Sequence, residues 1–137
     1  MFEIRILNDE RGANGERLGV ISAGDLTERF TCTPANGTVA QLAARWLAAL
    51  QSLLAGADSV ALVHDPRFAW IVYREPEGCF IQQLMSLDGD FETIPPRETV
   101  TEDGERISEW AVSLSEIQRF VETQPGHRTR LISRADA

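Results

Sequence analysis

The sequence predicts an α+β fold, in which a twisted antiparallel sheet of five to seven strands packs against two amphipathic helices. Two segments predict the helices, because each begins with a capping-box signature and continues with apolar residues at helical spacing. Short apolar or alternating runs, separated by turn residues, predict the strands around them. A length of 137 residues with 43% hydrophobic residues suits one domain, which we place over residues 1–124.

The N-terminal part of the chain is expected to open the sheet. Apolar and charged residues alternate over residues 2–6, and the apolar run 18–21 follows the turn pair Asn14-Gly15. These two runs predict an antiparallel hairpin with a long loop. A third extended segment is expected over residues 25–33, which Pro34 ends.

The first helix is predicted to begin after Thr38. Gln41 lies three residues further on, as a capping box requires, and Gly56 ends the pattern. The apolar residues between them recur at helical spacing: Val39, Leu42, Ala43, Trp46, Leu47, Leu50, Leu53 and Leu54. The segment is therefore an amphipathic helix.

A meander of antiparallel strands is predicted after this helix. The continuous apolar run 59–63 is typical of a buried strand, and the runs 68–73 and 79–85 flank a turn at residues 75–78. Asp103-Gly104 then separates two further extended segments, 97–101 and 106–112. Each of these turns is expected at the surface.

The second helix is predicted to begin at Ser113, which Glu116 follows at capping-box spacing. Its apolar side follows the helical period until Pro125-Gly126: Leu114, Ile117, Phe120 and Val121. Residues 125–137 form a polar tail that bears arginines. Two alternatives stay open for this tail, disorder and folding back over the acidic body of the domain.

The charge of the chain is negative and unevenly distributed. The chain has 21 acidic and 13 basic residues, for a net charge of −8, and residues 88–110 include eight acids and two arginines. Such a body repels nucleic acid and attracts a basic protein. No apolar run approaches the length of a membrane span, and residues 1–7 lack a secretory signal, so the protein is expected to stay in the cytoplasm.

No residue set predicts catalysis, a cofactor or a metal. Cys32 and Cys79 are expected to be free, buried thiols, and two histidines supply a zinc site poorly. His64 ends an apolar strand beside Asp65, yet neighbouring residues of a strand point to opposite faces. A core role for His64 is therefore favoured over an acid–base role, and the protein is expected not to be an enzyme.

Several short motifs resemble the immunity proteins of bacterial contact-dependent growth inhibition. The most specific is Glu102-Asp103-Gly104-Glu105 leading into Ile107-Ser108-Glu109-Trp110. The others are spread over most of the chain: Arg45-Trp46, Gly56, Ser59-Val60-Ala61-Leu62, Trp70, Tyr73-Arg74, Ile81-Gln82, Arg97-Glu98-Thr99, Ile117 and Phe120. From the sequence alone, we expect Trp46, Trp70 and Trp110 to be core residues rather than exposed residues that bind a partner.

The resemblance implies a non-catalytic inhibitor that binds a toxin C-terminal domain and blocks its active site. The acidic charge suits a nuclease-like partner with a basic substrate groove. We expect the partner to contact the acidic turns, through Glu75, Glu77, Asp88, Asp90, Glu92, Glu102, Asp103 and Glu105. A monomer or weak homodimer is expected. The alternative is a self-associating or effector-partner module without catalytic activity.

Overall fold

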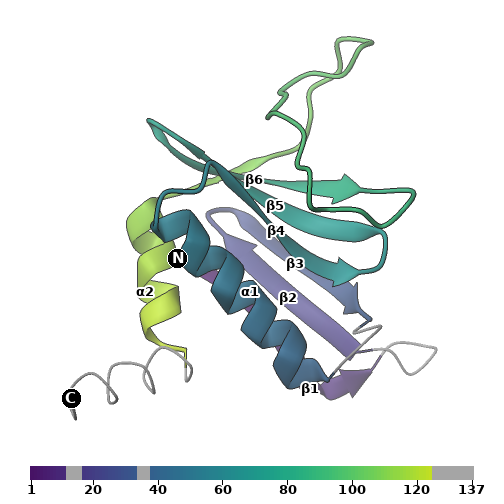
Figure 1. Ribbon diagram of the computed structural model, residues 1–137, viewed down its shortest axis with the longest axis vertical. Helices are drawn as coiled ribbons and strands as arrows, with labels where there is room; N and C mark the ends of the chain where they lie inside the picture. The colour runs from purple at the N-terminus through teal and green to yellow at the C-terminus, as the bar shows by residue number, and fades with distance from the viewer. Residues whose placement is uncertain (12–16, 34–37, 125–137) are drawn as a thin grey trace.

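The computed structural model describes residues 1–11, 17–33 and 38–124. Within them, antiparallel strands form two sheets and two helices pack beside them (Figure 1). The α+β class is confirmed, whereas the single predicted sheet is in fact divided into two. The elements follow the chain in this order: β1 (Phe2–Arg11), β2 (Arg17–Ala23), β3 (Leu26–Cys32), α1 (Val39–Leu54), β4 (Ser59–Asp65), β5 (Phe68–Glu75), β6 (Gly78–Met85), β7 (Trp110–Val112) and α2 (Leu114–Glu122).

The first sheet has the order β1-β2-β3, and all its strands are antiparallel. The predicted N-terminal hairpin and the third extended segment are thus confirmed, while Asn14-Gly15 lies outside the described residues. Gly19 pairs with Phe30 across β2 and β3. A Cβ at Gly19 would lie 2.7 Å from the Phe30 ring and 2.9 Å from Cys32 Sγ, so glycine lets these two buried side chains close over the strand.

The second sheet has the order β4-β5-β6-β7 and is also antiparallel. Burial alternates along β4, which places Val60, Leu62 and His64 on one face. The register between β4 and β5 shifts between Val63 and Asp65. This irregularity lies beside the point where β3 meets β4, because the Thr33 N–H donates to the His64 carbonyl at 2.8 Å.

Both helices begin where the sequence predicts. Thr38 caps α1 with the complete capping box, since its hydroxyl accepts from the Gln41 N–H and the Gln41 side chain accepts from the Thr38 N–H. Ser113 caps α2 by accepting from the Glu116 N–H. The buried side chains of the helices repeat at helical spacing: Leu42, Trp46, Leu50, Leu53, Ile117 and Val121.

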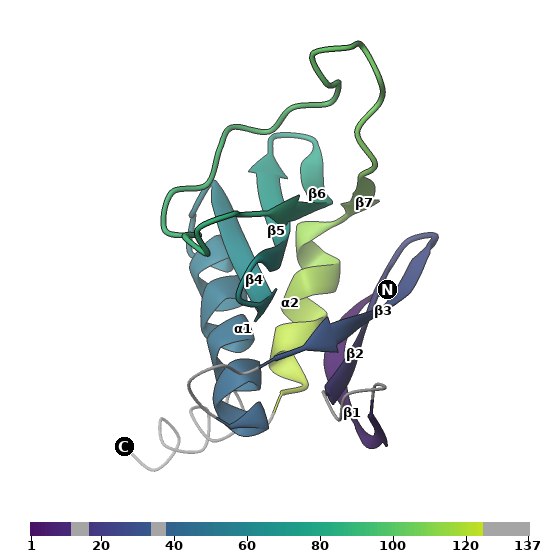
Figure 2. The ribbon, with the colours of Figure 1, turned by 90° about the vertical axis from the view of Figure 1, so that its right-hand side faces the viewer.

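One hydrophobic core joins the two helices to the facing sides of the two sheets (Figure 2). Trp70 lies at its centre, with no exposed surface, and its ring lies edge-on to Phe30 at 5.9 Å and to Trp110 at 6.4 Å. Trp46 is also buried, and its Nε1–H donates to the Val63 carbonyl. The predicted core role holds for Trp46 and Trp70, whereas Trp110 is only half-buried.

The opposite face of the second sheet has its own smaller cluster. Ala69, Ile71 and Tyr73 are buried there, and the segment between β6 and β7 covers them with Phe91 and Ile94. In Figure 2 this segment crosses the sheet on the side away from the helices and then projects from the top of the molecule. Both faces of β5 are therefore covered, one by helices and sheet and the other by a long loop.

The second predicted hairpin is only partly formed. Residues 97–101 are not a strand, and β7 is limited to Trp110–Val112; a single bridge, between Val100 and Arg106, joins the two arms. The physical reason is that residues 99–106 are all exposed and have no apolar face to bury. The predicted tail, 125–137, lies outside the described residues.

Candidate interaction surface

The acidic side chains of the predicted contact surface lie in three places on the second sheet. Glu75 and Glu77 occupy the β5–β6 turn at one end of the strands, and residues 88–92 follow β6 at the other end. Glu102, Asp103 and Glu105 lie on the projecting segment, which we define as residues 99–107 (Figure 1). Glu75 is half-buried, and the other seven predicted contact residues are exposed.

Arg97 connects the first of these places to the base of the projecting segment. Its guanidinium makes a bidentate pair with Glu109, at 3.0 Å from Nε to Oε1 and 2.5 Å from Nη2 to Oε2. Its Nη1 lies 3.9 Å from the Glu75 carboxylate, and its Cζ lies 3.7 Å from the centre of the Phe80 ring. The hydrogen bond from Arg97 lowers the pKa of Glu109, which therefore stays ionised. Glu75 is thus partly engaged inside the protein.

Further hydrogen bonds fix the base of the projecting segment to the outer face of the sheet. Gln82 is buried, and its Nε2 donates to the Glu98 carbonyl and to Glu109 Oε1, both at 2.8 Å. The Tyr73 hydroxyl donates to the Pro95 carbonyl at 3.0 Å. We call Arg97, Glu109 and Gln82 the Arg97 clamp. It was missed from the sequence, and it holds an exposed acidic turn on a rigid support.

The second acidic place is a compact turn that its own carboxylates organise. Asp88 accepts from the Ser86 hydroxyl at 2.7 Å and from the Asp90 N–H, while Asp90 accepts from the Glu92 N–H. The hydrogen bond from Ser86 lowers the pKa of Asp88, so this carboxylate is ionised. The Ser86 N–H donates to the Arg67 carbonyl at 2.8 Å, which attaches the turn to the β4–β5 connection.

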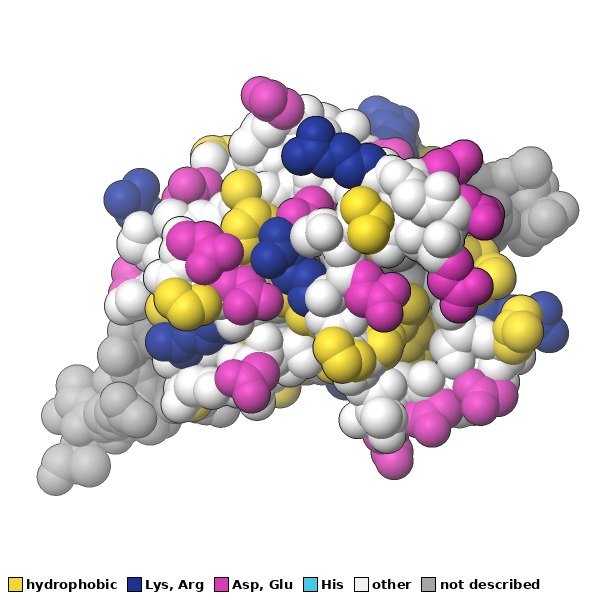
Figure 3. All heavy atoms as spheres, turned by 90° about the horizontal axis from the view of Figure 1, so that it is seen from above, with side chains coloured by type: hydrophobic (Ala, Val, Ile, Leu, Met, Phe, Trp, Pro, Cys, Tyr) yellow, Lys and Arg dark blue, Asp and Glu magenta, His cyan; other side chains and the backbone are white. Residues whose placement is uncertain are grey.

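The face from which segment 99–107 projects shows many carboxylates. Seen from above in Figure 3, Asp and Glu side chains are spread over this face, with a few arginines and separate hydrophobic side chains between them. The acids do not form one continuous patch. Any partner that engages all three places must therefore reach from one end of the β5 and β6 strands to the other.

His64 occupies a structural position. Its side chain is 4% exposed, its Nδ1–H donates to the Thr31 carbonyl at 2.8 Å, and its ring lies 4.6 Å from the Phe30 ring. Asp65 instead accepts from the Arg67 N–H and the Thr33 hydroxyl. Burial lowers the pKa of His64, so the ring is neutral at pH 7. The geometry places no carboxylate on either ring nitrogen of His64 among the described residues.

The two cysteines are free and buried in the described structure. Burial raises the pKa of Cys32 to about 12 and raises that of Cys79 as well, so both are thiols at neutral pH. Within residues 1–11, 17–33 and 38–124, no group of three or more His, Cys, Asp and Glu side chains could hold a metal ion. No helix of these ranges has the length and apolar character of a membrane span.

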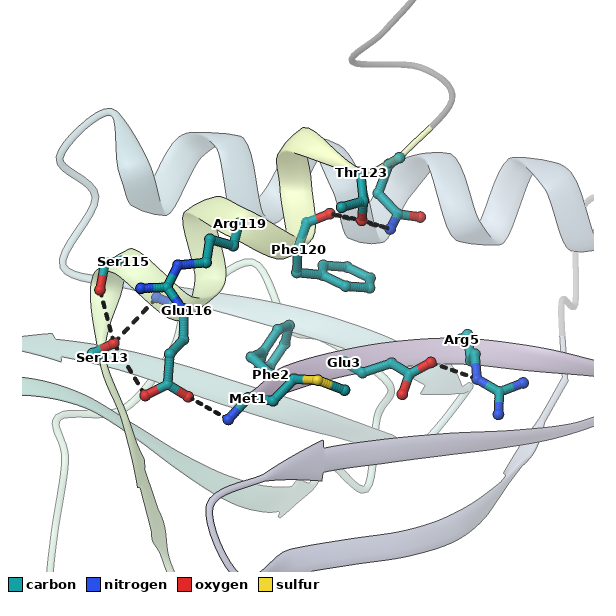
Figure 4. A pocket seen from close by; sticks show the side chains of 11 residues that line it. Met1, Phe2, Glu3, Arg5, Ser113, Ser115, Glu116, Arg119, Phe120 and Thr123 are labelled. Atoms are coloured by element: carbon teal, nitrogen blue, oxygen red, sulfur yellow. Dashed lines mark hydrogen bonds and ion pairs between the residues drawn. The ribbon is translucent and has the colours of Figure 1, made fainter.

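A pocket of about 680 Å³ lies between β1 and α2 (Figure 4). Phe2 and Phe120 meet edge-on on one side, at 5.3 Å between ring centres. The Met1 amino group pairs with Glu116 at 2.9 Å, and Arg5 pairs with Glu3. Four of the charged groups at this pocket are thus paired, and the pocket contains none of the predicted contact residues.

Comparison with known proteins places the chain in a family. A search of curated protein sequences finds no match. Among solved structures, a chain of the "CdiA-CT/CdiI toxin and immunity complex from Enterobacter cloacae" is similar over 90% of this chain and 97% of its own length, with a TM-score of 0.74. At 23% sequence identity, this likeness establishes a shared fold.

The family model described as "CdiI N-terminal domain" matches residues 37–120, which is more than half of the chain. The match begins just before α1 and ends within α2, so it includes the whole second sheet and the Arg97 clamp. The chain therefore belongs to the CdiI N-terminal domain family, which confirms the predicted resemblance to the immunity proteins of contact-dependent growth inhibition.

Proposed function

We propose that this protein binds the C-terminal domain of a cognate contact-dependent growth inhibition toxin and neutralises it by covering its active site. Membership of the CdiI N-terminal domain family is the observation that carries the proposal. The similar fold in a complex described as toxin and immunity supports it. The protein acts without catalysis of its own, in the cytoplasm of the cell that it protects.

The toxin domain is proposed to be a nuclease. A nuclease needs a positive groove to hold the phosphates of its substrate, and a protein of net charge −8 is attracted to such a groove. Opposite charges accelerate encounter and exclude wrong partners more than they add affinity. Fast capture is what an inhibitor of a toxic enzyme requires.

The three acidic places on the second sheet are the proposed contact regions. They lie on turns and on the projecting segment, where sequence can vary without loss of the fold, and the Arg97 clamp supports one of them from below. An interface of the ordinary total size, about 1,600 Å², is wide enough to include more than one of them. Carboxylates at its rim would give the on-rate and the specificity.

The test is a titration of the purified protein with the C-terminal domain of the large secreted protein encoded immediately upstream. Calorimetry at about 50 mM and about 300 mM salt measures affinity and its dependence on charge screening. Growth of cells that express the toxin domain, with and without this protein, measures neutralisation. We expect a one-to-one complex that weakens with salt and restores growth.

Three other outcomes are informative. Tight, protective binding that does not depend on salt would keep the toxin-inhibitor role and reject the acidic contact surface. Binding and protection against a toxin domain without nuclease activity would reject only the proposed chemistry of the partner. Failure to bind and to protect would reject the function.

A further inference from the structure

Exposed apolar side chains gather at the end of the second sheet where β6 stops. Phe68, Met85 and Leu87 are 37%, 55% and 80% exposed. Phe68 and Met85 are register partners on neighbouring antiparallel strands, so they project from the same face. Leu87 follows two residues later. We call these three residues the Leu87 patch.

The backbone around the Leu87 patch is fixed. The Ser86 N–H, between Met85 and Leu87, donates to the Arg67 carbonyl next to Phe68. Gly89, with a φ of 75°, packs so closely on the β4–β5 turn that a Cβ there would lie 2.8 Å from the Pro66 carbonyl oxygen. The three apolar side chains are therefore presented by a strand pair and a tight turn, whose conformation needs little ordering on binding.

Three exposed acids follow Leu87 closely along the chain. Asp88, Asp90 and Glu92 are exposed, and the hydrogen bonds of the turn hold the first two in place. Apolar anchors at the centre with charged groups at the rim is the usual arrangement of a protein–protein interface. The rim also limits the partner, because a surface that meets three carboxylates must be basic.

We propose that the Leu87 patch is the apolar centre of the interface with the toxin domain, and that Asp88, Asp90 and Glu92 form its negative rim. This inference rests on the proposed function. It assigns to the partner a basic surface with an apolar depression that receives Leu87 and Met85. It also assigns different parts to two of the acidic places. Residues 88–92 contact the partner next to the apolar centre, and the projecting segment contacts it at the periphery, where its charge speeds association.

Val100 provides the matched control. It is 52% exposed, like Met85, but it lies alone on the projecting segment among acidic and polar residues. A Val100→Ser variant therefore removes a similar exposed apolar group from the rival contact region. Because all of these side chains are exposed, their serine variants should fold like the natural protein.

The experiment titrates the upstream toxin domain with the natural protein, the double variant Met85→Ser/Leu87→Ser and the Val100→Ser variant, at two salt concentrations. We expect the double variant to lose about tenfold or more in affinity, with its salt dependence unchanged, and to protect growth poorly. Val100→Ser should stay within about twofold. Circular dichroism and urea denaturation confirm that each variant is folded.

The outcomes separate this inference from the function on which it rests. If the natural protein binds and protects, and the double variant does so equally well, the Leu87 patch is not the interface and the function stands. If only Val100→Ser weakens binding, the centre of the interface is the projecting segment. If the natural protein neither binds nor protects, the proposed function fails and this inference fails with it.

Discussion

The two faces of the second sheet are covered in different ways. On the inner face, Trp70 and Val72 are fully buried against α1, α2 and the first sheet. On the outer face, Ile71 and Tyr73 are also buried, but the segment that covers them is a loop without regular structure. That loop brings only the half-buried Phe91 and Ile94 and is attached by directed polar contacts.

The two faces therefore have different roles: the inner face stabilises the fold, and the outer face holds the acidic turns at the surface. Regular elements bury large apolar areas on the inner face, which supplies most of the free energy of folding. The outer face uses fewer apolar contacts and the Arg97 clamp to hold acidic turns in fixed positions. A surface of this kind can change its exposed residues without disturbing the core, which suits a protein that must match one particular partner.

The strongest test of this comparison removes one aromatic ring from each face. Trp70→Ala empties a fully buried site on the inner face and should lower the free energy of unfolding by about 3 to 5 kcal/mol. Phe91→Ala removes a half-buried ring from the outer cover and should cost about 1 to 2 kcal/mol. Urea denaturation followed by circular dichroism measures both values.

Equal losses for Trp70→Ala and Phe91→Ala would contradict the comparison, because the outer cover would then be part of the main core. A different conclusion would follow if the denaturant slope changed in Phe91→Ala but not in Trp70→Ala. It would mean that the loop already separates from the sheet before the rest unfolds.

The second test breaks the Arg97 clamp. Arg97→Ala leaves Glu109 with the Gln82 hydrogen bond but without its cationic partner, and it should cost about 1 to 3 kcal/mol, a value limited by partial exposure of the pair. Arg97→Lys keeps the charge but loses the bidentate geometry and the contact with Phe80, so it should cost an intermediate amount. Hydrogen exchange should report local opening at the Ile107 and Thr101 N–H groups, whose acceptors are the Thr99 and Glu105 carbonyls.

Arg106→Ala is the matched control for the clamp. Arg106 lies on the same projecting segment but is exposed, so its loss should change stability by less than about 0.5 kcal/mol. If Arg106→Ala accelerates exchange of these N–H groups as much as Arg97→Ala does, general charge balance holds the segment and the clamp does not.

The regular elements could be predicted from the sequence for physical reasons that the structure makes plain. Thr38 and Ser113 cap helices because their hydroxyls satisfy backbone N–H groups three residues on, and this is a local signal. The division into two sheets could not be predicted, since nothing local indicates that β3 meets β4 without a ladder of paired residues, through contacts such as those of Thr31 and Thr33 with His64.

The acidic surface was predicted as a set of turns, and the turns exist, but their distances from one another depend on long-range packing. The Arg97 clamp could not be predicted from the expected hairpin. A two-residue turn at Asp103-Gly104 would place Arg97 opposite Trp110, whereas the observed bridge between Val100 and Arg106 places it opposite Glu109. The Leu87 patch could not be predicted either. Phe68 and Met85 lie on the inner face, and nothing local in the sequence shows that the cover of this face ends before them.

The third test uses pH to separate the two faces. Burial lowers the pKa of His64 on the inner face, so below an unfolded-state pKa of 6.5 the unfolded chain takes up a proton that the folded chain does not. Stability is therefore present above this pH and declines as the pH falls toward the folded-state pKa. Arg97 lowers the pKa of Glu109 on the outer face, so its contribution is lost only as the pH falls below 4.5.

Two variants assign these windows to the two faces. His64→Asn keeps an amide donor for the Thr31 carbonyl and should flatten the stability profile in the upper window alone. Glu109→Gln should flatten it in the lower window and leave the decline near neutral pH intact. Denaturation measured at steps of pH gives both slopes. A decline below pH 6.5 that survives His64→Asn would assign the upper window to another group, and the inner face would then tolerate acid better than its buried imidazole implies.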